Sequence, residues 1–310
     1  MDDKVFALLP AMAEARDRFM ELVETLRPEL HRYCARMTGS VIDGEDVVQE
    51  ALAKAYYALG QTMEPPNLKP WLFRIAHNTA MDFLKRADRK NVDLVADVPE
   101  RAEAEAAGVD PALVEAALTV FIELPPVQRG ALILKDVLGH SLEEVADTMG
   151  TSVGAVKAAL FRARANLART SPATLISNAP SLSTEERASL QRYADLFNDR
   201  DWDALRSLIA QEARLDLVSR VQRRVADARY FDRYAEISQL NDVHAVVGFV
   251  DGVAAIGMFS TPSSPAPDYF ILLGWEHGHI SLVRDFIHVP YIADDAHFIA
   301  ARENKGQKNS

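Results

Sequence analysis

The sequence is poor in cysteine, since Cys34 is the only one among its 310 residues. A single thiol cannot form an internal disulfide, which suits a reducing compartment, so we expect a cytoplasmic protein. Cys34 stands in a stretch with helical apolar periodicity. This position indicates a structural thiol rather than a reactive one.

Long hydrophobic runs are also missing. No stretch of about 18 apolar residues occurs, so we expect no membrane span. The first residues, MDDKVFALLP, are acidic and lack the basic segment of a secretory signal. With 48% hydrophobic and 25% charged residues, the chain has the composition of a globular protein and the length for two or three domains.

Positive charge is in the minority, and the formal net charge of -11 argues by itself against a polyanionic partner. The charge is unevenly distributed, however. Residues 91–112 hold six acidic side chains and one basic one, whereas the second half of SLEEVADTMGTSVGAVKAALFRARANL (141–167) holds basic side chains and no acid. Only the docking face meets the phosphates, so this local basic face matters more than the net charge.

Residues 141–167 predict two helices joined by a tight turn. Ser141 and Glu144 have the spacing of a capping box for the first helix. Gly150 can take a positive φ in the turn, and Ser152 can cap the second helix. That second helix carries a stripe of apolar residues, Val156, Leu160, Ala163 and Leu167. This layout is typical of a helix-turn-helix whose second helix enters a major groove; a helical hairpin with a solvated basic face is the alternative.

The longer stretch ELPPVQRGALILKDVLGHSLEEVADTMGTSVGAVKAALFRARANL closely resembles region 4 of the extracytoplasmic-function sigma factors. In that family the helix-turn-helix ends close to Val-Lys-Ser-Arg-Leu-x-Arg-Ala-Arg, and residues 156–164 supply the matching run. Two polar positions of the family pattern are Ala158 and Ala159 here, which removes a DNA contact. The DNA-binding residues that the resemblance implies in this block are Thr151, Ser152, Lys157, Phe161, Arg162 and Arg164.

Residues 14–90 read as helical, with an interruption at Pro28, where a helix could start or kink. DGEDVVQEALAKAYYAL (43–59) predicts one helix with Asp43 as N-cap, and PWLFRIAHNTAMDFLKRADRK (70–90) predicts another. These two stretches resemble sigma region 2.2 and regions 2.3 and 2.4. Both blocks stand in the order that the sigma family has, with a linker between them.

The resemblance implies that the 43–59 helix docks on the coiled coil of the largest polymerase subunit. Acidic side chains on a helix can pair with basic side chains of such a partner, although a solvated acidic face is the alternative. The polymerase-binding residues carried over are Asp46, Gln49 and Glu50.

The family also implies that region 2 opens and reads the upstream promoter element near the start site. Separated strands expose bases, which need a basic track and flat surfaces for stacking, and the 60–68 loop could hold an extruded base. Trp71 fits a core anchor better than a stacking platform. The candidate DNA-binding residues of this block are Lys69, Arg74, His77, Asn78, Lys85 and Arg86.

The last part of the chain changes character. Residues 184–209 read as two helical stretches, and Asp251-Gly252 separates two β-rich runs, as Glu276-His277-Gly278 does further on. The pattern predicts helices packed on a curved antiparallel sheet, an α+β domain. This part looks like a SnoaL-like or ketosteroid-isomerase-like domain, whose cone encloses a pocket.

The predicted fold class is therefore multidomain, with two all-α sigma domains followed by an α+β SnoaL-like cone. In the sigma family the first linker threads toward the channel where RNA leaves, and an acidic linker would suit basic channel walls. Solvated disorder is the alternative explanation of its acidity. The expected parts are region 2 (1–90), an acidic linker (91–112), region 4 (113–170), a second linker (171–183), the SnoaL-like regulatory domain (184–300) and a flexible tail (301–310).

Pocket enzymes of this fold need a carboxylate or histidine base tuned by burial. Asp285 faces inward while Arg284 faces outward, or the reverse, and a surface ion pair of Asp285 with an arginine is the simpler interpretation. No constellation is specific enough to name a reaction, and no metal or cofactor is expected. The candidate pocket residues are Asp216, His244, Asp285 and His288.

A basic stretch before the sheet reads as helical. It could meet the acidic region 2 helix or DNA, and a solvated face is an equal alternative. Its members are Arg220, Arg223, Arg224 and Arg229.

The sequence thus predicts a sigma factor, not an enzyme, that brings core RNA polymerase to promoter DNA. The attached C-terminal domain has a high effective concentration near the sigma regions, so weak intramolecular contacts, or a small ligand in its pocket, could regulate them. One alternative is a small-molecule enzyme of ketosteroid-isomerase-like fold fused to a DNA-binding module. Another, a one-component ligand-sensing repressor, leaves the 43–59 resemblance unexplained.

Overall fold

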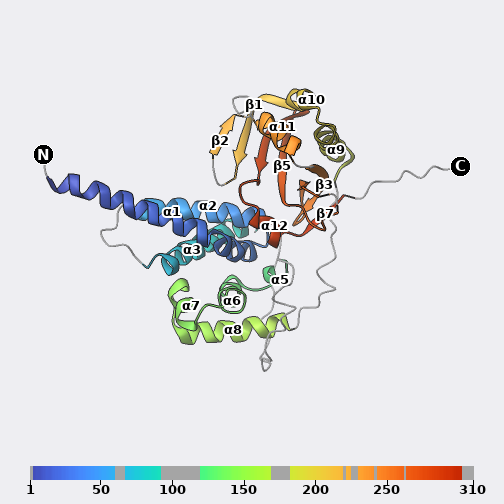
Figure 1. The fold of residues 1–310 in the computed structure, drawn as a ribbon. Coiled ribbons are helices and arrows are strands. Elements are labelled where there is room, and N and C mark those ends of the chain that lie inside the picture. Colours follow the sequence, from blue (N-terminus) through green and yellow to red (C-terminus); the bar gives the residue numbers. More distant parts are fainter. Residues whose placement is uncertain are drawn as a thin grey trace. The chain divides into compact units, whose positions relative to one another are not determined.

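The computed structural model in Figure 1 describes residues 3–59, 67–91, 119–168, 182–218, 221–224, 230–240, 243–261 and 263–301. The chain divides into two compact units, Met1–Ser177 and Asn178–Ser310, which are taken in turn below. Most of the 60–68 loop, nearly all of both predicted linkers and nearly all of the 301–310 tail lie outside the described residues.

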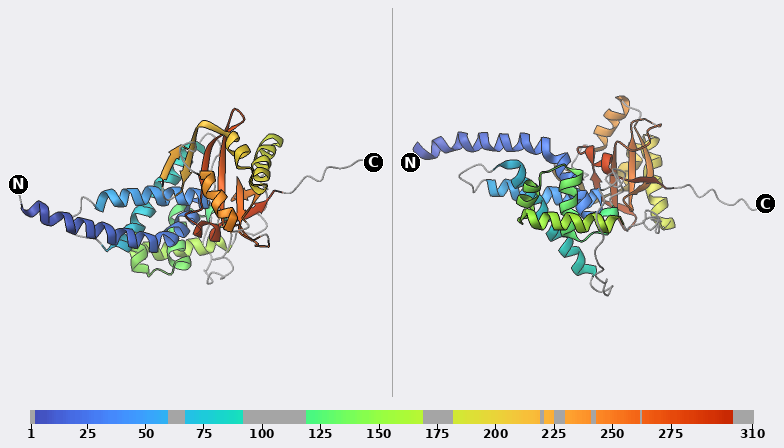
Figure 2. Two further views of the ribbon diagram at one scale, coloured as in Figure 1. Left: turned by 45° about the horizontal axis from the view of Figure 1, so that its top comes forward. Right: turned by 90° about the horizontal axis from the view of Figure 1, so that it is seen from below.

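Segment 1, the first half of the first unit, consists of three helices that lie side by side (Figures 1 and 2): α1 (Asp3–Thr38), α2 (Val41–Leu59) and α3 (Leu68–Asn91). No helix starts at Pro28, because α1 runs through it. A proline inside a helix costs about 3 kcal/mol. Leu26 and Leu30 on either side of it are buried in the same core, and this packing offsets the lost hydrogen bond.

The start of α2 also differs from the expectation. The helix begins at Val41, so Asp43 lies inside it and is not its N-cap. The Ser40 hydroxyl precedes the helix and accepts a hydrogen bond from the Asp43 amide, at 3.3 Å. Inside α2, a Cβ atom added to Gly44 would lie 2.5 Å from the Cα atom of Ala35. Glycine therefore lets the backbones of α1 and α2 approach closely at this point.

Segment 2, the second half of this unit, carries the predicted helix-turn-helix. The capping box is present, since Ser141 Oγ accepts from the Glu144 amide at 3.1 Å and Glu144 Oε2 accepts from the Ser141 amide at 2.7 Å. Gly150 takes a φ of 62° in the turn, and Ser152 caps the second helix. The elements of segment 2 are α5 (Thr119–Ile122), α6 (Pro126–Leu132), the π-helix η1 (Ile133–Val137), α7 (Leu142–Met149) and α8 (Val153–Leu167).

The two segments share one hydrophobic core. Leu30, Tyr33 and Phe73 of segment 1 belong to the same buried cluster as Phe121 and Leu132 of segment 2. The predicted stripe of α8 points into this cluster, with all four of its members buried. We expected two separate helical bodies, and the structure instead packs them as one.

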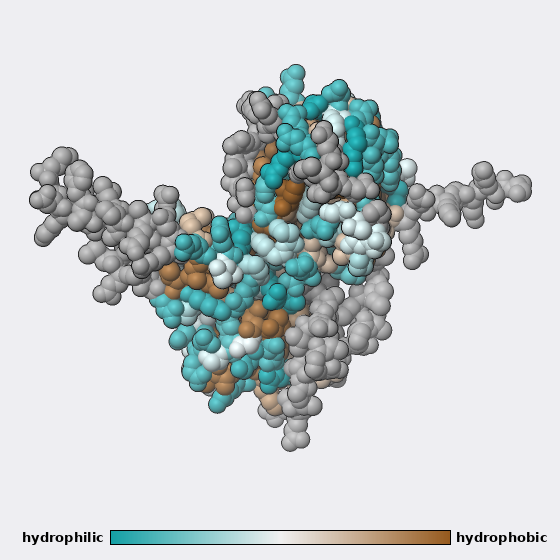
Figure 3. All heavy atoms as spheres, viewed as in Figure 1, coloured by the Kyte–Doolittle hydropathy of each residue, from teal (hydrophilic) through white to brown (hydrophobic). Residues whose placement is uncertain are grey.

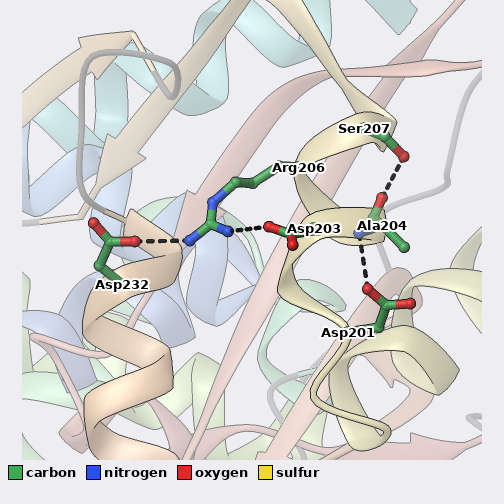
Figure 4. Close-up of polar contacts among 6 residues, drawn as sticks. All are labelled: Asp201, Asp203, Ala204, Arg206, Ser207 and Asp232. Carbon is green, nitrogen blue, oxygen red and sulfur yellow. Dashed lines mark hydrogen bonds and ion pairs between the residues drawn. The ribbon is translucent and has the colours of Figure 1, made fainter.

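The second unit is an α+β structure, as expected. Its helices are α9 (Thr184–Asn198), α10 (Trp202–Leu208), α11 (Tyr230–Leu240) and the short α12 (Tyr291–Asp295). Buried side chains of α9, α10 and α11 form one core with residues of the sheet strands. Arg206 links two of these helices, because its guanidinium contacts Asp203 on α10 and Asp232 on α11, each at 2.7 Å (Figure 4).

The sheet has seven strands in the order β2-β1-β6-β5-β4-β3-β7. Neighbouring strands are antiparallel except β1 and β6, which run parallel. Both predicted hairpins are present: Asp251 and Gly252 take φ values of 48° and 85°, and His277 and Gly278 take 50° and 78°. The strands are β1 (Ile209–Leu217), β2 (Val221–Arg224), β3 (His244–Val250), β4 (Val253–Phe259), β5 (Tyr269–Glu276), β6 (His279–Asp285) and β7 (Phe298–Ala300).

The expected basic helix before the sheet is wrong. Arg223 and Arg224 lie in strand β2, where they pair in register with Leu215 and Arg214 of β1. Arg220 and Arg229 lie outside the described residues. Local charge and apolar spacing favoured a helix here, but pairing with an existing strand edge decided the backbone conformation.

Candidate functional site

An exposed basic face lies along α8, the second helix of the helix-turn-helix. Lys157, Phe161 and Arg162 are exposed on it, and Thr151 and Ser152 are exposed at its start. Phe161 keeps 41% of its surface accessible although it is a large apolar residue. Of the two alanines that replace polar family positions, Ala158 is exposed and Ala159 is buried.

Arg164, by contrast, is bound to a side chain of the same segment. Its Nη2 and Nε atoms donate to the two carboxylate oxygens of Asp136, at 2.7 and 3.0 Å. The hydrogen bond to Asp136 raises the pKa of Arg164. Asp136 lies in the π-helix η1, so this bidentate pair fastens α8 to η1.

The candidates on α3 fall into two groups. Asn78, Lys85 and Arg86 are exposed, although Arg86 donates to Glu50 Oε2 at 3.1 Å. Arg74 and Lys69 point at other parts of the first unit. Arg74 Nε donates to the Asp147 carbonyl oxygen of α7 at 2.8 Å, and Lys69 Nζ lies 3.0 Å from Glu29 Oε2 of α1.

His77 is unavailable to a nucleic acid in this structure. Only 5% of its surface is exposed, and its Nδ1 atom shares a 2.6 Å hydrogen bond with the Tyr33 hydroxyl. Burial lowers the pKa of His77 to about 4, so the ring is neutral at pH 7. The helical spacing of α3 places His77 on the same side as the core residues Phe73 and Ala80.

The candidate polymerase contacts lie on α2. Asp46 is exposed, whereas Gln49 and Glu50 are half-buried. Glu50 pairs with Lys54 at 2.8 Å in addition to Arg86, and the hydrogen bond from Lys54 is the main cause that lowers the pKa of Glu50. The carboxylate thus stays charged, but intramolecular partners already occupy it.

Large apolar side chains also reach the surface of segment 1. Tyr57 keeps 72% of its surface exposed, Tyr56 51% and Met20 47%. Hydrophobic residues form small separate groups on the largely hydrophilic face drawn in Figure 3.

Polar contacts that the sequence did not reveal hold the two segments together. The buried Arg129 of α6 donates through Nη1 to the Met37 carbonyl oxygen of α1. It also donates through Nη2 to the carbonyl oxygens of Ile122 and Leu124, at 2.8 and 2.9 Å. Because this guanidinium satisfies carbonyls from both segments, it fixes their junction.

A second junction joins α1 to the loop before α7. His140 Nε2 donates to Glu29 Oε1 at 3.1 Å, and the His140 ring packs edge-on against Phe73 with centroids 4.9 Å apart. The hydrogen bond from His140, and to a smaller extent that from Lys69, lowers the pKa of Glu29 against the opposing effect of burial. Glu29 therefore collects donors from both segments.

In the second unit, the candidate pocket residues separate. Asp285 is completely buried and faces the helices, so the expected surface pair of Asp285 with an arginine is wrong. Arg284 instead lies 3.4 Å from Asp216, its neighbour in register on β1. His244 stacks on Phe259 with ring centroids 5.3 Å apart, and His288 contacts Arg233 at 3.3 Å.

Within the described ranges, no three His, Cys, Asp or Glu side chains stand close enough to hold a metal ion. The helices in those ranges include none long and apolar enough to cross a membrane. Cys34 is buried, and burial raises the pKa of its thiol, as expected of a structural cysteine.

Comparison with known proteins now accounts for the first unit. The Sigma-70 region 2 family matches residues 22–90, and the Sigma-70, region 4 family matches residues 115–167. The ECF RNA polymerase sigma factor SigM of Mycobacterium tuberculosis is 31% identical over 161 residues, which cover 51% of this chain and 79% of SigM. This chain belongs to the extracytoplasmic-function family of RNA polymerase sigma factors.

Longer matches to sigma factors include part of the second unit. The ECF sigma factor SigG of Mycobacterium tuberculosis is 34% identical over 229 residues, which cover 64% of this chain and 61% of SigG. The chain therefore spans less than two thirds of SigG. The crystal structure of SigJ from the same organism matches over 88% of this chain and 99% of SigJ, with 18% identity and a TM-score of 0.35.

Region 2 lies in segment 1 and region 4 in segment 2. The predicted DNA-binding residues of these regions fall into two groups. The exposed face of α8 is open to a ligand, whereas Arg74, Lys69 and Arg164 have partners within the sigma part. These pairs could not be predicted from local sequence patterns, because each joins residues at least 28 positions apart.

We predict different stability effects for two charge reversals on α8. Arg164→Glu breaks the pair with Asp136 and brings two carboxylates together, so urea unfolding should show a loss of about 2–4 kcal/mol. Lys157→Glu, on the exposed face of the same helix, should change stability by less than about 0.5 kcal/mol. Equal losses for the two variants would contradict the bracing role of Arg164.

Proposed function

We propose that this chain is a sigma factor that binds core RNA polymerase in the cytoplasm, directs it to promoter DNA and starts transcription. It is not itself a catalyst. The observation that carries the proposal is the capped helix-turn-helix of region 4, whose second helix exposes Lys157, Phe161 and Arg162. Such a helix suits the major groove, where basic side chains meet phosphates and base edges.

Region 2 would supply the polymerase contact and the second DNA contact. Asp46 of α2 is exposed for a basic partner surface, and Asn78 and Lys85 of α3 are exposed for DNA. Acidic groups on α2 and basic groups on α3 suit partners of opposite charge. His77, Arg74 and Arg164 are not needed for this assignment.

The packing of the two segments implies an opening step. Arg74 of region 2 is bound to the Asp147 carbonyl of region 4, and Arg129 bridges the segments with a buried guanidinium. We therefore infer that the free chain is closed and that polymerase binding separates regions 2 and 4. The binding energy of polymerase would then have to exceed that of the shared core, so closure lowers the apparent affinity.

The second unit would act as an attached regulator. Its tethering keeps it at a high effective concentration near the sigma regions, so weak contacts can shift the closed and open populations. Enzymatic activity is the alternative, and the buried Asp285 is the one group in the described part of this unit that resembles a tuned base.

Transcription in vitro tests the sigma assignment. The full chain with core polymerase should give transcripts that start at promoters carrying its upstream element. Lys157→Glu should reduce them at least tenfold without weakening core binding, because it places a carboxylate against DNA phosphates. Arg192→Glu, an exposed reversal of the same charge on α9, is the matched control and should keep full activity. Equal activity of Lys157→Glu and wild type would rule out this groove face.

Truncation tests the regulatory part. A chain ending at Ser177 retains the whole first unit, so it should still bind core polymerase, but its transcript yield should differ from that of the full chain at least threefold. The yield is measured at saturating promoter DNA and equal core occupancy. Identical yields would mean that the second unit does not control the sigma regions.

A further inference from the structure

The helix that would enter the major groove, α8, packs on the rest of segment 2 through an apolar stripe of mostly small side chains. Figure 1 shows α8 lying beside α6 and α7, which it contacts. Two of the five buried residues are alanines with a single methyl group each, and apolar burial has no preferred direction. Packing alone therefore fixes the rotation of α8 about its own axis only weakly. The five residues are Val156, Ala159, Leu160, Ala163 and Leu167.

Two polar pairs flank this stripe. On one side, Arg164 holds both carboxylate oxygens of Asp136. On the other side, Asn166 Nδ2 donates to Gln128 Oε1 of α6 at 2.9 Å. A helix turns by about 100° per residue, so positions 164 and 166 lie on opposite flanks of the buried stripe. One pair resists rotation of α8 in each direction.

The backbone that carries Asp136 has a rare conformation. In the π-helix η1, the Leu138 amide donates to the Ile133 carbonyl oxygen, five residues earlier, at 3.0 Å. Lys135 Nζ donates to the His140 carbonyl oxygen at 2.9 Å, which ties the same turn to the loop before α7. Such widened turns are found most often at functional sites. Asp136 therefore stands on a rigid and unusual support.

Rotation of α8 matters because its exposed side chains must meet base edges. Lys157 and Phe161 lie on the same flank of the helix as Arg164 and are exposed. Their outer atoms lie about 5–6 Å from the helix axis, so a rotation of about 20° moves them by about 2 Å. A hydrogen bond does not survive such a displacement. Sites of this kind need supporting hydrogen bonds that lock their side chains in place.

We propose that Asp136 and Gln128, which lie outside α8, position this helix in the major groove and thereby set which bases it prefers. Arg164 is then a positioning residue that acts through Asp136, although the family pattern puts it in the DNA-reading run. This inference rests on the proposed function, because it assumes that region 4 of this chain reads promoter DNA.

A phosphate contact is the competing role of Arg164, whose side chain keeps 31% of its surface exposed. The salt dependence of DNA binding separates the two roles. Loss of one phosphate contact lowers the slope of log affinity against log salt by about 1. Loss of positioning leaves that slope unchanged and reduces the discrimination between bases.

The test uses holoenzyme assembled from the full chain and core polymerase, with promoter fragments randomised in the upstream element. The wild-type holoenzyme selects its preferred fragments. The preference is the ratio of its affinities for a selected and a scrambled fragment. Asp136→Ala and Arg164→Met should each lower this preference at least tenfold and leave the salt slope unchanged. Lys157→Met is the contrasting variant and should lower the slope by about 1.

A charge exchange tests the pair itself. Asp136→Arg combined with Arg164→Asp restores an ion pair of reversed polarity, so the preference should return to within about threefold of wild type. Asp136→Asn keeps the shape of the side chain and one acceptor oxygen. It should lower the preference at least threefold, and it carries the test if Asp136→Ala does not fold.

A destabilised control separates positioning from stability. Leu26→Ala opens a cavity in the core beside α1 and lowers the unfolding temperature without touching α8. At equal occupancy of core polymerase, it should keep the wild-type preference. A comparable loss of preference in Leu26→Ala would assign the effect to stability and overturn the proposal.

Two further results would overturn it. One is a wild-type preference in Asp136→Ala or, where that variant does not fold, in Asp136→Asn. The other is a salt slope lowered by about 1 in Arg164→Met, which would place Arg164 on a phosphate. If the wild-type holoenzyme selected no fragments at all, the sigma assignment would fall together with this inference. Selection by wild type with unchanged variants would remove this inference alone.

Discussion

A buried guanidinium joins the two sigma segments, and the conformation of the first unit depends on it. Arg129 of region 4 bonds the Met37 carbonyl of region 2 while it also satisfies carbonyls at the start of its own segment. A buried charge is costly unless hydrogen bonds surround it, so separating the segments must leave this group hydrated or unsatisfied. The shared hydrophobic core adds the apolar part of the same junction. The opening proposed above would therefore be a cooperative event rather than a gradual loosening.

Ion pairs within each sigma segment give the net charge of the chain a simple interpretation. Basic side chains that could meet DNA are partly neutralised inside the sigma part: Lys69 by Glu29, Arg86 by Glu50 and Arg164 by Asp136. The exposed face of α8 is the exception. An acidic chain can thus carry a DNA-binding helix while several of its other basic groups have acidic partners, which lowers the positive potential that non-specific polyanions would meet.

Local features were predictable from the sequence, and distant contacts were not. The capping box at Ser141, the turn at Gly150 and both hairpin turns are confirmed, because each depends on a few consecutive residues. Pro28 suggested a helix start that the structure does not have, because packing on both sides of it outweighs a local helix-breaking preference. His77 was assigned to DNA from its residue type, but only the fold shows that its helix turns it toward the core. The hydrogen bond from Tyr234 to the buried Asp285 was missed because it joins residues 51 positions apart.

The closed state can be tested directly by measuring one distance within the sigma part. Cys34 is buried with a raised thiol pKa, so spin labels would attach selectively to cysteines introduced at two exposed positions, Glu24 on α1 and Ala168 at the end of α8. Pulsed electron paramagnetic resonance of the free chain should give one narrow distribution of short distances between the two spin labels. Addition of core RNA polymerase should replace it with a distribution at longer distances. A distribution that stays unchanged when polymerase is bound and transcription is active would contradict the opening of regions 2 and 4.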